Sequence, residues 1–92
     1  MKSIIQIDDN RCFLCQMARG TEEHHIFGGP NRRLSDEDGL TVRLCRVCHE
    51  EVHEGDNSKA LMKALHELGQ TKYEAAGHTR KEFMDRYGRN FL

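Results

Sequence analysis

The sequence predicts a small α+β domain in which a two-stranded hairpin and a helix form a metal-binding core and further helices follow. The first observation is that the chain's four cysteines form two Cys-x2-Cys pairs. The second is that four of its six histidines lie between or just after these pairs. The third is the absence of a repeat or linker. We therefore expect a single domain over residues 1–92, with a metal core at 12–53 and a helical C-terminal extension at 57–92.

Composition favours a metal as a source of stability. The chain has 92 residues, of which 37% are hydrophobic and 32% charged, with no Trp and one Pro. A chain of this size buries a marginal core, and a structural metal commonly supplies the missing stability. The net charge of −1 does not indicate a general nucleic-acid binder. Basic residues do gather around the metal motif, at Arg32, Arg33, Arg43 and Arg46.

The N-terminal residues indicate a protein that is neither secreted nor membrane-bound. Residues 3–7 form a short strand or an extended lead-in. This apolar stretch is interrupted by Gln6 and followed by Asp8 and Asp9, unlike a signal peptide, and no run has transmembrane length. We expect a cytoplasmic location, where reduced thiols bind zinc, although four cysteines can also form two disulfides.

The hairpin is predicted from two short runs separated by a break. Residues 22–27 read as a strand that carries a histidine pair, and Gly28-Gly29-Pro30-Asn31 ends it. Residues 32–39 form a polar loop that can include a helical turn after Ser35. Residues 40–44 alternate as a second strand, which ends at the second cysteine pair.

Three helices are predicted after the hairpin. The first runs from Val47 to His53 and ends at Gly55. The second is capped by Asp56 or Asn57 and runs to about Ala76, with Gly77 as its stop. Its apolar stripe is Leu61, Ala64, Leu65, Leu68 and Tyr73. A capping box, Thr79 with Glu82, opens the last helix, whose inner side carries Phe83, Met84 and Tyr87.

The two cysteine pairs predict a closed zinc site. Each pair, Cys12 with Cys15 and Cys45 with Cys48, can hold one edge of a tetrahedron, and together they complete a four-thiolate shell. Such a shell leaves no position for water. We therefore expect a structural zinc ion that does no chemistry.

The histidines predict a second, functional site. Strand alternation directs His24 and His25 to opposite faces, so one can bind a metal while the other orients or deprotonates a water. His49 and His53, four residues apart, share one helix face. His66 and His78 lie outside this group and are expected to be surface residues.

Two segments resemble a known family. Glu23-His24-His25-Ile26 followed by Leu44-Cys45-Arg46-Val47-Cys48-His49 is similar to the motif of the HNH endonucleases, which have the ββα-metal fold. Many members also carry a zinc ion bound by two Cys-x2-Cys pairs. The resemblance covers residues 12–53, and the C-terminal residues 87–92 resemble small HNH-like proteins of bacteriophages and prophages.

The resemblance assigns a role to each histidine. His25 corresponds to the general base that activates water, while His24 and His49 correspond to ligands of a catalytic divalent ion, Mg²⁺, Mn²⁺, Ni²⁺ or Zn²⁺. His53 becomes an additional ligand, and Arg32, Arg33, Arg43 and Arg46 become phosphate contacts.

One element departs from the family pattern. The family's central Asn, which braces the loop that orients the base, normally lies nine residues before the helix histidine, where this chain has Leu40. Asn31 or Asp38 can substitute, and Asn31 is the candidate we place in the catalytic site.

The predicted function is hydrolysis of phosphodiester bonds in DNA by an HNH-type endonuclease of a bacterial cell, phage or prophage. RNA is the other nucleic acid that the pattern allows, and no membrane partner is expected. The alternative is a non-catalytic zinc-binding module that binds nucleic acid or a protein on a degenerate HNH scaffold.

Overall fold

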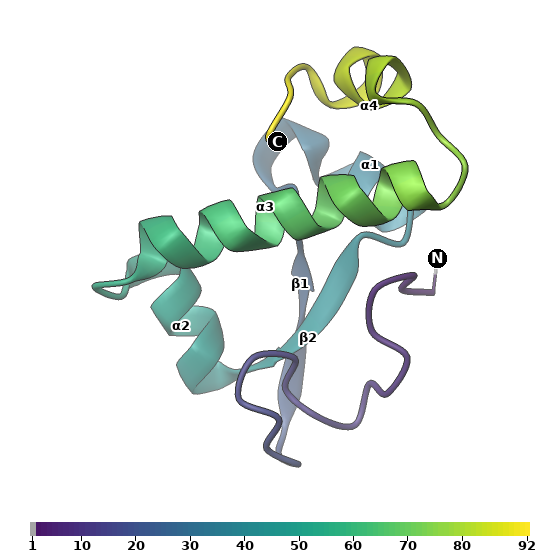
Figure 1. The fold of residues 1–92 in the computed structure, drawn as a ribbon. Coiled ribbons are helices and arrows are strands. Elements are labelled where there is room, and N and C mark those ends of the chain that lie inside the picture. Colours follow the sequence, from purple (N-terminus) through teal and green to yellow (C-terminus); the bar gives the residue numbers. More distant parts are fainter. Residues whose placement is uncertain (1) are drawn as a thin grey trace.

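The centre of the structure is a two-stranded antiparallel sheet followed directly by a helix (Figure 1). The computed structural model describes residues 2–92. Strand β1 (Thr21–His25) pairs with strand β2 (Thr41–Cys45), and helix α2 (Arg46–Glu54) begins at the next residue. The predicted strands and helix are present, with ends that differ by about two residues at most, a normal spread for such boundaries.

The connection between the strands is more helical than predicted. A 3₁₀ turn, η1 (Gly29–Asn31), leads into helix α1 (Arg32–Glu37), which begins at Arg32 and not after Ser35. Ser35 explains why this polar segment folds. Its side chain is fully buried, accepts a hydrogen bond from the Phe27 amide at 3.2 Å and donates one to the Leu40 carbonyl at 2.6 Å. These bonds join the end of the first strand to the start of the second.

A long helix packs against this core. Helix α3 (Ser58–Ala75) crosses the hairpin in Figure 1, and its buried residues include Leu65 and Tyr73. Gly69 allows the close contact, because a Cβ atom there would lie 2.6 Å from Ile26 Cγ2. The predicted apolar stripe is present except at Ala64, which is exposed.

The C-terminal segment packs back onto α3. Helix α4 (Arg80–Tyr87) opens with the predicted capping box, in which the Thr79 hydroxyl accepts from the Glu82 amide. Phe83 and Tyr87 are buried, but Met84 is 42% exposed, so its predicted inward orientation is wrong. Because Met84 is one residue after Phe83, the helix turns it away from the buried side.

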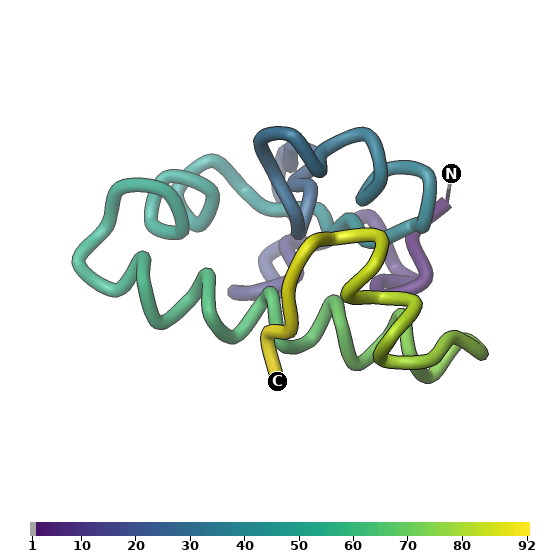
Figure 2. Tube along the Cα trace, turned by 90° about the horizontal axis from the view of Figure 1, so that it is seen from above, coloured from purple at the N-terminus to yellow at the C-terminus, as the bar shows by residue number. Residues whose placement is uncertain are grey.

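The last residues are fixed by a buried glutamine of α3. Gln70 is fully buried, and its Oε1 atom accepts from the Phe91 amide at 2.7 Å. Its Nε2 atom donates to Asn90 Oδ1, also at 2.7 Å. Figure 2 shows the resulting position of the C-terminal end against the middle of α3.

Residues 3–7 form no strand, and bends at Ile4, Ile5 and Ile7 make this segment less extended than the predicted lead-in. They are nevertheless attached to the sheet, because the Ile4 amide donates to the Gly39 carbonyl at 2.9 Å and Gln6 Oε1 accepts from the Arg43 amide at 2.6 Å. Within residues 2–92, no helix combines the length and apolar character that a membrane span requires.

Candidate functional site

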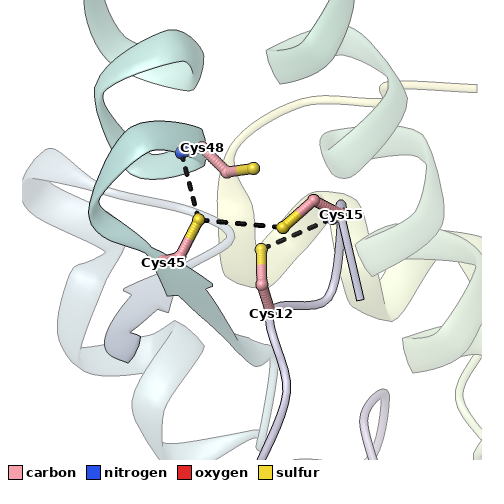
Figure 3. A group of neighbouring side chains, drawn as sticks. All are labelled: Cys12, Cys15, Cys45 and Cys48. Atoms are coloured by element: carbon pink, nitrogen blue, oxygen red, sulfur yellow. Dashed lines mark hydrogen bonds between the residues drawn. The ribbon is translucent and has the colours of Figure 1, made fainter. Parts of the chain in front are cut away.

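Four cysteine side chains converge beside the junction of β2 and α2. Cys12 and Cys15 come from an N-terminal turn, Cys45 ends β2 and Cys48 lies in the first turn of α2, and Figure 3 shows their sulfur atoms directed at one another. All four sulfurs lie within 4.8 Å of one another, and the Cys15 and Cys45 sulfurs are 3.8 Å apart. A tetrahedral zinc site with bonds of about 2.3 Å has sulfur–sulfur edges of about 3.8 Å.

Backbone amides surround the two cysteine pairs. The Cys15 amide donates to Cys12 Sγ and the Cys48 amide to Cys45 Sγ, each at 3.5 Å. The turn carrying Cys12 is tied to β2, because the Phe13 amide donates to the Arg43 carbonyl. All four cysteines are free, so the alternative of two disulfides is wrong for this structure. The cluster is suited to binding one metal ion and is compatible with structural zinc.

The four thiols do not ionise alike. Burial opposes ionisation of Cys12, but backbone N–H groups outweigh it and lower its pKa to about 6. The pKa of Cys15 is lowered chiefly by the Met17 amide. Burial and the neighbouring sulfurs raise the pKa of Cys48. A positive ion between the sulfurs would favour loss of the proton from Cys48.

Three histidines form a second cluster between β1 and α2. His24 on β1 meets His49 and His53 on α2, with ring centroids 5.3 and 5.4 Å from its own. One ring nitrogen from each lies within 4.8 Å of the others. The Glu22 carboxylate is 3.1 Å from His49 Nδ1, which leaves His49 Nε2 free to bind an ion.

His24 is the decisive member of this cluster. It is 3% exposed, and its Nε2 atom is the only buried side-chain nitrogen or oxygen without a hydrogen-bond partner among residues 2–92. Burial, followed by the neighbouring histidines, lowers its pKa to about 4, so the imidazole is neutral at neutral pH. A buried and neutral imidazole with an unpartnered nitrogen, next to two other histidines, fits a metal ligand.

His25 lies in a different environment from His24. Its Nε2 atom is 3.4 Å from Asp36 Oδ1 and 3.5 Å from Glu23 Oε1. His25 nevertheless reaches the same cavity as His24, of about 320 Å³, whose wall is formed by Glu23, His24, His25, Gly28, Gly29, Arg32, His49 and His53. The two histidines thus have different partners around one shared cavity, and their division of roles stays a prediction.

The remaining predicted site residues are dispersed. Asn31 does not line this cavity, and its side-chain amide donates to the Tyr87 carbonyl at 3.2 Å. Arg43 donates to the Thr21 hydroxyl and carbonyl, which places it within the sheet.

The other three arginines lie at cavities or on the surface and not within the sheet. Arg32 lines the cavity beside His25, and Arg33 lines an adjoining one. Arg46 is 86% exposed and 3.4 Å from Glu50.

The two remaining histidines, His66 and His78, lie outside both clusters. His66 is half-buried and stacks on Phe27, with ring centroids 5.3 Å apart, so its predicted surface position is wrong. His78 is exposed, as predicted.

Sequence reasoning missed two carboxylates of the site. Asp36 next to His25 lies within an acidic run with no distinguishing pattern. Glu22 next to His49 carried a weak signal, since alternation places it on the same strand face as His24.

Comparison of the chain with protein families, with curated proteins and with solved structures found no match.

Proposed function

We propose that this protein is a metal-dependent endonuclease of the HNH type, which hydrolyses phosphodiester bonds in DNA. The observation that carries the proposal is that His24, whose Nε2 atom is buried without a hydrogen-bond partner, has a ring nitrogen within 4.8 Å of one from His49 and one from His53. His25 lines the same cavity, which is open to solvent and has Arg32 in its wall. This arrangement supports hydrolysis better than a purely structural role, because a structural metal site is closed and this one is open.

His24, His49 and His53 would hold the divalent ion. Imidazole nitrogens suit Mn²⁺, Ni²⁺ or Zn²⁺ as ligands, and Mg²⁺ would keep more of its water. When bound, the ion would supply Lewis-acid stabilisation of the negative charge on the scissile phosphate. His24 and His49 are held by the strand and the helix respectively, which fixes the ion's position relative to His25.

His25 would act as the general base. Its Nε2 atom faces two carboxylates, and its Nδ1 atom has no protein hydrogen-bond partner in the described chain. Nδ1 would accept a proton from a water molecule as the water oxygen forms a bond to phosphorus. The bond from phosphorus to the 3′ oxygen breaks, and that oxygen takes a proton from solvent.

Arginines would hold the DNA backbone near the cavity. Arg32 lines the cavity and Arg33 is 82% exposed next to it, so both can reach phosphates on either side of the cleaved bond. Such contacts recognise backbone geometry and carry no base information. We therefore expect cleavage with little sequence preference.

Plasmid nicking tests the proposal. We expect the full chain to nick supercoiled DNA with added Mg²⁺, Mn²⁺ or Ni²⁺, and His25→Ala to lower kcat about a hundredfold or more, since general-base catalysis contributes about 10²–10⁴. His78→Ala is the matched control, because it removes an exposed histidine outside both clusters. A labelled RNA in the same assay determines which nucleic acid is cut.

One observation favours the alternative, a non-catalytic module that binds nucleic acid or protein. Leu40, at the place of the family's central Asn, is fully buried and can form no side-chain hydrogen bond. A chain that binds one zinc ion, takes up no further divalent ion and cleaves nothing would contradict the nuclease proposal and support this module.

A further inference from the structure

Leu40 stands where the family that the motif resembles has an asparagine that braces the loop, and in this chain other hydrogen bonds brace the connection between the two strands. Ser35 closes the connection from inside, through its bonds to the Phe27 amide and the Leu40 carbonyl. Being fully buried, Ser35 fixes the position of α1 relative to the end of β1, where His25 lies. The buried hydroxyl thus does the bracing that Leu40 cannot do.

Helix α4 holds the same connection from outside. Asp38 Oδ2 accepts hydrogen bonds from Arg86 Nε and from the Tyr87 hydroxyl, each at 2.6 Å. Asn31 donates to the Tyr87 carbonyl, and Arg86 also contacts Glu37 at 3.1 Å. Asn31 and Asp38, the two predicted substitutes for the missing asparagine, are therefore both engaged with α4. Helix α1 is fixed at both of its ends.

The residue that this fixed helix presents to His25 is Asp36. Its Oδ1 atom lies 3.4 Å from His25 Nε2, long for a hydrogen bond, but such contacts at catalytic sites shorten when substrate binds. A carboxylate can only accept, so the nitrogen facing it carries the proton and the other ring nitrogen keeps its lone pair.

We propose that Asp36 is a positioning residue that fixes the orientation and tautomer of His25, an inference that rests on the proposed nuclease function. Asp36 Oδ1 accepts a hydrogen bond from Nε2–H, and Nδ1 is thereby left with the lone pair that takes the proton of water. The role is that of a carboxylate which orients a catalytic imidazole without taking its proton.

Glu23 competes for the same proton and is the weaker partner. Its Oε1 atom lies 3.5 Å from His25 Nε2, but an Nε2–H group can make only one good bond. Glu23 has a longer side chain, which loses more rotamer freedom on being fixed. Asp36 is short and projects from a helix anchored by Ser35 and α4. We therefore expect Glu23→Gln to have the smaller effect.

Nitrogen NMR tests the tautomer without any substrate. Two-bond ¹H–¹⁵N correlations are recorded on the full chain with zinc and magnesium at about pH 8.5, above the ordinary titration range of histidine. His25 signals are assigned by their loss in His25→Ala. We expect the Nε2–H tautomer in the wild type and a mixture of tautomers in Asp36→Ala. Glu67→Gln, which changes a partly exposed carboxylate of α3 whose partner is Lys63, should leave the His25 signals unchanged.

Nicking kinetics supply the second readout. In Asp36→Ala we expect kcat to fall about tenfold to a hundredfold, as for other groups that orient a catalytic histidine, with KM and bound metal unchanged. Asp36→Glu should recover part of this loss.

Three results would overturn the role of Asp36. They are an Nδ1–H tautomer in the wild type, unchanged His25 signals in Asp36→Ala, and an additional divalent ion bound per chain that Asp36→Ala removes. If the wild type cleaves no DNA, the proposed function fails, and the tautomer measurement alone decides the role of Asp36.

Discussion

The four-cysteine and three-histidine clusters share helix α2 but differ in how their polar atoms are satisfied. In the cysteine cluster, backbone amides donate to Cys12 and Cys45, both of which are buried. In the histidine cluster, His24 Nε2 is buried with no partner at all, and its neighbour His53 is exposed. The comparison separates a closed site suited to stability from an open one suited to binding and chemistry.

Helix geometry explains how consecutive residues serve different clusters. Cys48 and His49 follow one another on α2, and each step along a helix turns the side chain by about 100°. Cys48 therefore faces the N-terminal turn, and His49 faces β1. His53, one turn later, returns to the same side as His49. One short helix thus contributes to both centres without any of its residues serving two purposes.

The largest predicted difference between the clusters is in folding. Cys45→Ser removes a thiolate from the closed site, and structural zinc contributes on the order of 10 kcal/mol, about the whole stability of a small domain. We expect this variant to lose the cooperative unfolding transition and the dispersed NMR spectrum of the wild type. Thermal unfolding followed by circular dichroism, together with the zinc content, measures the effect.

His53→Ala is the matched control for that experiment. It removes one exposed side chain from the open cluster and should keep the transition and the zinc ion. If Cys45→Ser unfolds at the wild-type temperature, or if His53→Ala also loses its fold, the division into a structural and a functional centre is wrong.

Acid should reveal the burial of His24. Its pKa is about 4 in the folded chain against 6.5 ordinarily, so between these values the unfolded chain takes up a proton that the folded chain refuses. Stability is therefore lost as pH falls below about 6.5. From pH 7.5 to pH 5 the free energy of unfolding should fall by about 2 kcal/mol through this group alone.

Urea unfolding of the wild type and of His24→Leu, each loaded with one zinc ion per chain and no other divalent ion, isolates that contribution. The leucine variant should lose about 2 kcal/mol less between the two pH values. Equal losses in both proteins would mean that His24 is not held neutral by burial, which would remove the main argument for the open cluster.

The elements with strong local signals could be predicted from the sequence. The capping box of Thr79 and Glu82 and the glycine stop at Gly77, with φ of +109°, act within a few residues. The equal spacing of the two cysteine pairs was enough to predict that all four cysteines lie together. Helix α1 was missed because its stability comes from Ser35, whose two partners lie on either side of it in the chain.

The site was predicted less completely, because its geometry depends on tertiary contacts. His24 and His25 line one cavity, although strand alternation directs them to opposite faces. The contact of Asp36 with His25 exists only because α1 is placed beside the end of β1. Arg43 similarly carries a charge that suits phosphate, yet the register of the strands directs it to Thr21. Neither result follows from residue type or spacing.

The smallest predicted effect concerns a carboxylate that belongs only to the open cluster. Glu22 Oε1 lies 3.1 Å from His49 Nδ1 and holds the ring of His49, whose centroid lies 5.3 Å from that of His24. Partners of this kind change metal affinity by about tenfold to a hundredfold, and exposure of Glu22 places it at the lower end. Calorimetric titration of Glu22→Gln with Mn²⁺ should therefore show about tenfold weaker binding, while the zinc content and the unfolding transition stay at wild-type values. Glu50→Gln, on the same helix as His49 but paired with Arg46, should leave both unchanged. A loss of zinc in Glu22→Gln would mean that the two clusters are energetically one centre, because a change beside His49 would then reach the four thiolates.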